Sequence, residues 1–482
     1  MFDFRPIFFV VGLLLTTLAI AMCAPLVVDA AAGNDEWRVF AGSAALTAFI
    51  GVTMILTTRS TTRRINIRQA FILTTGSWLV LTTFSALPFA FSGLGLSFTD
   101  SFFEAMSGIT TTGSTVISGL DAAPGGILLW RALLQWLGGI GIIVMAIAIL
   151  PMLKIGGMQL FRMEASDHSE KVMPRVTQVA SGIGFVYLAL TVICAVALWA
   201  VGFDGFDAVA HAMTTIATGG FSTSDGSIAG FDNPAAELIV TIFMIVGGLP
   251  FVLYLQAVRG EPEALLRDSQ VRCFLIIVIA CIAVLGIWHH LATGAPLTQS
   301  YREVAFNVVS IITGTGFSSA NYGRWGAFAV GVFFFLMFVG GCAGSTTCGI
   351  KVFRFQVLYA TALAQIHRLV QPHGVFVPHF NKQPITEEIA SSVMGFFFLF
   401  VIMFAAIALA LGAIGLDFIT AVSGAATAIC NVGPALGEII GPTGNFAALP
   451  DAAKWVLSFG MLLGRLELFT VMVMLAPSFW RG

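Results

Sequence analysis

Four short stretches rich in glycine and threonine carry the residues with the clearest chemical potential. Each stretch offers main-chain carbonyl oxygens, and its glycines can adopt the positive φ angles that a side chain would oppose. Carbonyl oxygens arranged in this way can replace the hydration shell of a monovalent cation. The residues of these four strips, numbered first to fourth along the chain, are Thr111, Thr112 and Gly113; Thr218, Gly219 and Gly220; Gly314, Thr315 and Gly316; and Asn431, Val432 and Gly433.

Other kinds of site find little support in the sequence. No Asp or Glu lies in any strip, which disfavours a divalent-cation site built on rings of carboxylates. The seven cysteines form no CxxC pair, and the seven histidines show no metal-ligand spacing. A polytopic membrane enzyme is the alternative from a different class, but it needs clustered catalytic His, Asp or Glu residues at the membrane interface, which the sequence lacks. We therefore expect no enzymatic activity and no organic cofactor.

The segments that precede the four strips share one design. Each strip follows a short apolar run, beginning near Phe102, Phe206, Tyr301 and Phe418, and the strip glycines recur about every 100 residues. The unit is a spanning helix, a dipping segment and a second spanning helix. Main chain that dips into a bilayer must be buried in protein or line a cavity. Four short helices that end mid-membrane would point their negative carboxyl ends at a common axis, which favours a cation.

The composition places the whole chain in a membrane. Of its 482 residues, 57% are hydrophobic and 10% are charged, and the mean hydropathy is +0.93. We predict an all-α integral membrane protein with four pseudo-symmetric helix/pore-loop/helix repeats around a central pore, plus two N-terminal transmembrane helices. The predicted spans lie near residues 7–27, 39–57, 68–92, 127–153, 177–201, 234–257, 271–292, 327–350, 388–413 and 454–477.

The predicted units follow from the spans and the repeats. They are an N-terminal transmembrane helix pair at 1–66 and four pore repeats at 67–175, 176–268, 269–385 and 386–482. Lys and Arg gather in alternate connections, whereas the opposite loops carry mostly Asp, Ser, Gly and Asn. By the positive-inside rule, both termini are expected in the cytoplasm.

A glycine-rich run and an intramembrane arginine stand out in the last two repeats. Residues 340–351 read GGCAGSTTCGIK, and so many glycines weaken a helix. Small residues can also pack membrane helices closely, which is the alternative. Ile350 follows Gly349 where a nucleotide-binding P-loop has lysine, so that motif is excluded. Arg465 and Glu467 lie in an apolar span, where charges usually face a cavity or a partner; a helix-locking ion pair with Glu467 or another buried acid is the alternative.

The pattern of one strip glycine per loop in a single chain resembles the Trk/Ktr/HKT superfamily of potassium transporters. The match covers essentially the whole chain, and the N-terminal helix pair is similar to that of bacterial TrkH-type membrane subunits. This resemblance implies potassium uptake, with K+ held by the strips as the transported ion. Ser114 and Pro434 depart from an even ring, because Phe221 and Phe317 follow the glycine in the other two loops.

The same resemblance implies an intramembrane gate loop at 340–351 below the strips, with Arg465 in the permeation path. The gate residues so implied are Gly340, Gly341, Gly344, Ser345, Thr346, Gly349, Lys351 and Arg465. It also implies a homodimer in the bacterial inner membrane, bound to a TrkA-type cytosolic ring of nucleotide-binding domains that docks near residues 351–385. Membrane lipid is a further expected partner, and nucleic acid is not expected.

The nearer alternative is a sodium-permeable or sodium-coupled transporter of the same architecture. In the family, serine in place of the first strip glycine is linked with sodium passage, and Gly113 argues against it here. The carbonyl chemistry of the strips concerns monovalent cations in general, so the choice of potassium depends on the resemblance.

A few charged residues near the dipping segments have two interpretations. Glu104, Asp207 and His211 could draw cations to the outer mouth or hydrogen-bond neighbouring loops. Arg131 is expected to reach the membrane interface by snorkelling from the outer end of its helix.

Overall fold

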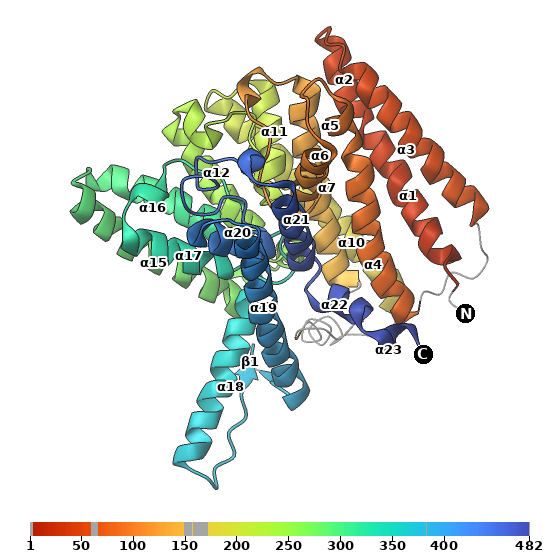
Figure 1. The fold of residues 1–482 in the computed structure, drawn as a ribbon. Helices are drawn as coiled ribbons and strands as arrows, with labels where there is room; N and C mark the ends of the chain where they lie inside the picture. The colour runs from red at the N-terminus through yellow and green to blue at the C-terminus, as the bar shows by residue number, and fades with distance from the viewer. Residues whose placement is uncertain (1–2, 59–65, 149–156, 158–171, 382, 482) are drawn as a thin grey trace.

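The computed structural model describes residues 3–58, 66–148, 157, 172–381 and 383–481, and most of them belong to helices (Figure 1). Within these ranges, seven helices are long and apolar enough to cross a membrane, or up to nine if two bent pairs each count as one span. The predicted all-α membrane class is confirmed, and the chain is a multi-pass membrane protein.

The helices form an N-terminal group followed by four units, each with one short helix between longer ones. The N-terminal group is α1 (Arg5–Ala21), α2 (Cys23–Ala31) and α3 (Trp37–Thr57). The units contain α4 (Ile67–Ser85), α5 (Leu87–Phe91), α6 (Phe98–Ile109) and α7 (Gly125–Ala148); α10 (Val172–Ala200), α11 (Gly205–Ile216), α12 (Pro234–Gly247) and α13 (Phe251–Val258); α15 (Ser269–Thr293), α16 (Leu297–Ile312), α17 (Ala327–Phe338) and α18 (Val352–Val370); and α19 (Glu387–Ala413), α20 (Phe418–Cys430), α21 (Asp451–Arg465) and α22 (Phe469–Leu475). The smaller elements are α14 (Ala264–Arg267), α23 (Pro477–Trp480), η1 (Leu120–Ala122), η2 (Ser227–Phe231), η3 (Tyr322–Arg324), η4 (Phe446–Ala448), β1 (His379–Phe380) and β2 (Gln383–Pro384).

The short helices α6, α11, α16 and α20 begin at defined sequence signals. Ser97, Asp204 and Asp417 precede α6, α11 and α20, and each side chain accepts a hydrogen bond from the amide three residues further on. Pro296 stands at the same place before α16. Hydrogen bonds from Thr420 hold the pKa of the Asp417 carboxyl below its usual value, because they favour the charged form.

Two predicted spans are interrupted where glycine and proline weaken the helix. The 234–257 span bends by 93° between α12 and α13, and Gly248 and Pro250 lie at the break. The 327–350 span is helical only as far as Phe338, where α17 ends. The first break corrects the prediction of one continuous helix at 234–257, whereas the second agrees with the predicted interruption at 340–351. The predicted end of the 127–153 span lies outside the described residues.

A third predicted span, 454–477, also departs from a straight helix. It bends by 114° between α21 and α22, and at the break Glu467 and Leu468 have φ angles of 60° and 34°. Neither residue is a glycine or a proline, so the local sequence gives no warning of this bend.

The helix α18 and the beginning of α19 project from the body of the molecule as a hairpin (Figure 1). Between them, β1 and β2 pair as a short antiparallel ribbon. Large apolar side chains on this hairpin are open to the surroundings; Leu369 is 82% exposed and Val375 is 91% exposed. The hairpin therefore offers an apolar surface away from the helical body.

A buried carboxylate fixes the N-terminal group to the first unit. Asp29 of α2 is fully buried, and its Oδ1 accepts a 2.7 Å hydrogen bond from the amide of Gly126 in the first turn of α7. The first amides of a helix have no partner within that helix, and a negative charge is favourable there. Asp29 thus caps a helix almost 100 residues away in the chain.

We predict that Asp29→Ala lowers the free energy of unfolding by about 1–3 kcal/mol, because it removes a charged acceptor from a buried amide. The measurement is thermal or denaturant unfolding of the detergent-solubilised protein. Asp29→Asn keeps an acceptor oxygen and should lose less. Equal stability of the parent and Asp29→Ala would contradict the capping role.

Candidate functional site

The four strips contact one another in a closed cycle. If each strip glycine carried a Cβ atom, that atom would overlap a carbonyl oxygen of the next strip. The distances would be 2.3 Å from Gly113 to Gly219, 1.8 Å from Gly220 to Thr315, 2.1 Å from Gly316 to Val432 and 2.7 Å from Gly433 to Thr112. The contacts run from the first strip to the second, third and fourth and back to the first. The strips therefore surround a common axis, and a side chain at any of these glycines would strike the neighbouring main chain.

The strips also share one backbone conformation. The φ angle at the first position is 53° at Thr111, 49° at Thr218, 65° at Gly314 and 52° at Asn431, and at the third position it is 87°, 75°, 83° and 106° at the four glycines. The middle residue of each strip has a negative φ. In such an alternation, successive carbonyl groups turn toward the same side of the chain. Three non-glycine residues hold a positive φ, which costs free energy and is typical of functional sites.

Each strip begins as the carboxyl cap of its short helix. In the first unit, the amide of Thr111 donates to the carbonyl of Gly108 (3.0 Å) and the amide of Thr112 donates to that of Ser107 (2.8 Å). The same pair of bonds closes α11, α16 and α20. This is the Schellman arrangement, which requires a left-handed residue just past the helix. It brings the negative ends of four helix dipoles to the strips.

A cavity of about 280 Å³ lies on one side of the ring, and the four strip glycines all line it. Its other polar lining includes Thr115, Ser222, Asp225 and Arg131. Both carboxylate oxygens of Asp225 accept hydrogen bonds from the backbone amides of Gly119 and Leu120. The cavity thus joins the glycines to a polar mouth.

The glycine-rich loop at 339–351 lies against the second strip. Thr346 accepts a hydrogen bond from the hydroxyl of Thr218 (3.1 Å), and its own Oγ1 bonds to the carbonyls of Gly247 (3.0 Å) and Ile216 (3.1 Å). These contacts tie the loop both to the end of α11 and to the break after α12. The predicted irregular loop is therefore beside the ring.

Seven of the eight predicted gate residues, all except Arg465, lie in this loop, and its glycines fit where side chains would not. A Cβ atom on Gly340 would lie 2.0 Å from the carbonyl oxygen of Cys348, and Gly344 and Gly349 have positive φ angles of 76° and 72°. The further bonds of the loop are Gly340 N to Ile350 O (2.9 Å), Gly341 N to Thr347 Oγ1 (3.2 Å), Ser345 Oγ to Cys342 O (2.6 Å), and Lys351 Nζ to Thr347 O. The segment is not a helix, so glycine serves the loop's own turns rather than close packing between helices.

Arg465 connects this loop to the first unit. Its Nη1 donates to the carbonyl of Thr346 (3.1 Å) and to Sγ of Cys348 (2.7 Å), and its Nη2 donates to the carbonyl of Gly138 in α7 (2.8 Å). The side chain is almost fully buried. Glu467 pairs with Arg354 at the start of α18 instead, so the alternative of an Arg465–Glu467 pair is wrong.

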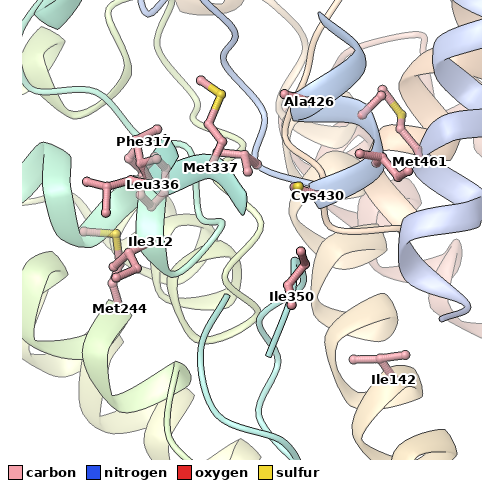
Figure 2. Close-up of a cluster of buried hydrophobic side chains, with 14 of the residues drawn as sticks. Ile142, Met244, Ile312, Phe317, Leu336, Met337, Ile350, Ala426, Cys430 and Met461 are labelled. Atoms are coloured by element: carbon pink, nitrogen blue, oxygen red, sulfur yellow. The ribbon is translucent and has the colours of Figure 1, made fainter. Parts of the chain in front are cut away.

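Apolar side chains fill the space around the loop. Ile350 belongs to the same buried cluster as Ile142, Cys430 and Met461, which come from α7, α20 and α21 (Figure 2). The loop is thus held by polar bonds at Thr346 and by apolar packing at Ile350.

Two of the sequence interpretations can now be decided. Arg131 is only 1% exposed and pairs with Glu104 at 2.8 Å, so the expectation that it snorkels to the interface is wrong. Glu104, Asp207 and His211 each hydrogen-bond the chain that leaves their own strip, through Thr115, Thr223 and Ser222 respectively. This agrees with the loop-bonding alternative.

Sequence analysis missed Gln135, which bonds directly to the second strip. The available signal was a polar residue in an apolar span, four residues after Arg131.

The fold and the ring of strips define a class of protein: a multi-pass membrane protein in which four short buried helices present main-chain oxygens to one axis. Comparison with known proteins agrees. A family model for TrkH, described as a cation transport protein, matches residues 36–481. The chain therefore belongs to the TrkH family of cation transport proteins.

Relatives extend over nearly the full length. The chain is 47% identical to the Trk system potassium uptake protein TrkI of Halomonas elongata, over 99% of this chain and 97% of the relative. It is 38% identical to the potassium uptake protein TrkH of Escherichia coli, over 99% of both. The crystal structure of the potassium transporter TrkH from Vibrio parahaemolyticus matches with a TM-score of 0.92 and 36% identity, over 100% of both chains. These relatives are named as transporters, which argues against the membrane-enzyme alternative.

We predict that Glu467→Gln lowers the free energy of unfolding by about 3–5 kcal/mol, because it removes the acid that pairs with the fully buried guanidinium of Arg354. Unfolding of the solubilised protein by denaturant is the measurement. Glu263→Gln is the matched control, since its ion pair with Arg267 is exposed and contributes little. Similar small losses in both variants would show that the buried ion pair stabilises the protein no more than the exposed one does.

Proposed function

We propose that the chain takes up potassium across the bacterial inner membrane through the ring of four strips. The observation that carries this proposal is the closed packing of the strips, in which each glycine meets a main-chain oxygen of the next. Carbonyl oxygens held around one axis can replace the water of a dehydrated K+ ion. The cargo is supported by the relatives, since TrkI of Halomonas elongata and TrkH of Escherichia coli are both named potassium uptake proteins.

The strips Thr111–Gly113, Thr218–Gly220, Gly314–Gly316 and Asn431–Gly433 are the proposed potassium ligands. Their oxygens come from the main chain and need no ionised side chain, so the ring carries no fixed negative charge that would favour a divalent ion. The dipoles of the four capped helices add a favourable potential for a single positive charge.

The loop at 340–351 and Arg465 form the proposed gate. An ion that leaves the ring on the side of the loop meets the guanidinium of Arg465, whose positive charge opposes it. It also meets the buried apolar side chain of Ile350, which resists wetting. Opening then requires the loop to leave its bonds with Arg465 and Thr218.

The proposal extends to the orientation of the chain and to its partners. We place both termini and the segment 351–385 in the cytoplasm, in agreement with the positive-inside rule. A homodimer and a TrkA-type cytosolic nucleotide-binding subunit are the proposed partners, and the hairpin at 351–385 is the proposed docking surface. Its exposed Leu369 and Val375 supply the apolar contact area that such docking needs.

Growth of a potassium-uptake-deficient bacterium at low potassium tests the proposed function. The parent chain, expressed with its partner subunit, should restore growth. Gly220→Ala should abolish the rescue, because its Cβ atom would overlap the carbonyl oxygen of Thr315 at a residue with a φ of 75°. Gly113→Ser tests the sodium alternative and should admit sodium. If a well-expressed parent fails to restore growth, potassium uptake is not the function.

We predict that Arg465→Ala raises passive potassium flux into reconstituted vesicles several-fold, because it removes a buried charge and two bonds that hold the loop. Arg267→Ala, which removes an exposed arginine, is the control and should leave the flux unchanged. An unchanged flux in correctly folded Arg465→Ala protein would discard the gate.

A further inference from the structure

Two polar side chains of α7 bond to the main chain of the second strip and the residues after it. Gln135 Nε2 donates to the carbonyl of Gly219 (2.5 Å), and its Oε1 accepts from the amide of Phe221 (3.0 Å). Arg131 Nη1 donates to the carbonyl of Ser222 (2.6 Å). Residues four apart lie on one face of a helix. A helix of the first unit therefore holds the second strip and the two residues after it through three hydrogen bonds.

The middle glycine of the second strip makes room for this contact. A Cβ atom on Gly219 would lie 2.4 Å from Cδ of Gln135. The other strips have Thr112, Thr315 and Val432 at this position. The Gln135 side chain thus occupies the space that a strip side chain fills elsewhere in the ring.

Arg131 is held in place by an acid of the first unit. Its Nε bonds to Oε1 of Glu104 at 2.8 Å, and both side chains are almost completely buried. Glu104 also accepts from the Thr115 hydroxyl (3.0 Å) and the Val116 amide (2.9 Å), which follow the first strip. The guanidinium lies 4.1 Å from the ring of Phe221. The continuations of the first and second strips are therefore joined through one ion pair.

The Gly219 carbonyl oxygen, which accepts the hydrogen bond from Gln135, is also the oxygen that packs against the first strip. Gly113 of the first strip packs against this same oxygen of Gly219. A hydrogen-bond donor fixes the direction of the carbonyl and draws electron density from it. Selectivity among alkali ions depends on the number, placement and field strength of such oxygens. The bond thus acts at the junction of two strips that would contact the ion.

We propose that Arg131 and Gln135, here called the α7 clamp, are specificity-determining positioning residues that set the preference for K+ over Na+. The inference rests on the proposed function, because it requires the strips to contact the permeating ion. The clamp acts through the second strip. A buried ion pair is by itself weak evidence for a stabilising role. The three hydrogen bonds to the second strip and the residues after it, in contrast, fix the position of that main chain directly.

The test compares potassium and sodium flux into vesicles that contain the purified full-length chain. Gln135→Met keeps the side-chain length and removes both bonds, and Gln135→Leu removes both bonds with a branched apolar side chain. The double variant Glu104→Gln with Arg131→Met removes both charges, so no charge is left buried alone. Each should lower the ratio of potassium to sodium flux about tenfold, since a polar bond at the site is lost.

Gln69→Ala is the matched control, because it removes two hydrogen bonds of a buried side chain at the start of α4, to the amide of Asn66 and the carbonyl of Asp3, and neither partner belongs to α7 or to a strip. It should lower the melting temperature and leave the flux ratio unchanged, which separates stability from selectivity. Only variants that elute as the parent does in gel filtration are compared. Gln135→Leu removes the same two bonds without adding a charge and serves if Gln135→Met does not fold.

The outcomes separate the inference from the function on which it depends. A parent with no preference for potassium overturns the proposed function and the clamp with it. A parent that prefers potassium, together with folded clamp variants that keep the same ratio, overturns the clamp alone. A lowered ratio in the clamp variants, with an unchanged ratio in Gln69→Ala, supports it.

Discussion

Main-chain polar groups inside a bilayer cannot be left facing lipid, and this constraint governs the structure. The four strips satisfy it by packing against one another, so that each strip glycine lies next to a main-chain carbonyl oxygen of the next strip. No strip has a complete environment alone, so the ring forms only when all four are present. The identical caps on α6, α11, α16 and α20 are the local means of bringing each strip to that position.

A single chain can make each quarter of the ring different, which four identical subunits cannot. The second strip has Gly219 where the others carry a side chain, and Gln135 fills the space. Ser114 donates to the carbonyl of Gly433 (2.8 Å), and Asn431 bonds to Thr112 (2.9 Å), so the fourth and first strips are linked by other means. The loop with Arg465 adds a further asymmetry beside the ring. Because the four strips are held by different side chains, a substitution next to one strip can change that part of the ring and leave the other three strips unchanged.

The features that could be predicted are those that depend on residues close together in the sequence. Apolar length indicated the spans, glycines at regular intervals indicated the strips, and the glycine-rich run at 340–351, together with the resemblance, indicated the irregular loop. Long-range pairing stayed hidden: Glu104 and Arg131 are 27 residues apart, and Arg354 and Glu467 are 113 apart, so no local window relates them. The bend after α21 also escaped prediction, because tertiary contacts rather than glycine or proline hold that backbone in place.

Locating the permeating ion directly is the sharpest test of this account. Crystals or frozen samples grown with thallium or rubidium, which substitute for potassium, would show the bound ion by its strong scattering. The account predicts a peak on the axis enclosed by the four strips, next to their carbonyl oxygens. An ion bound elsewhere, with the axis between Gly113 and Gly316 empty at saturating concentration, would contradict it.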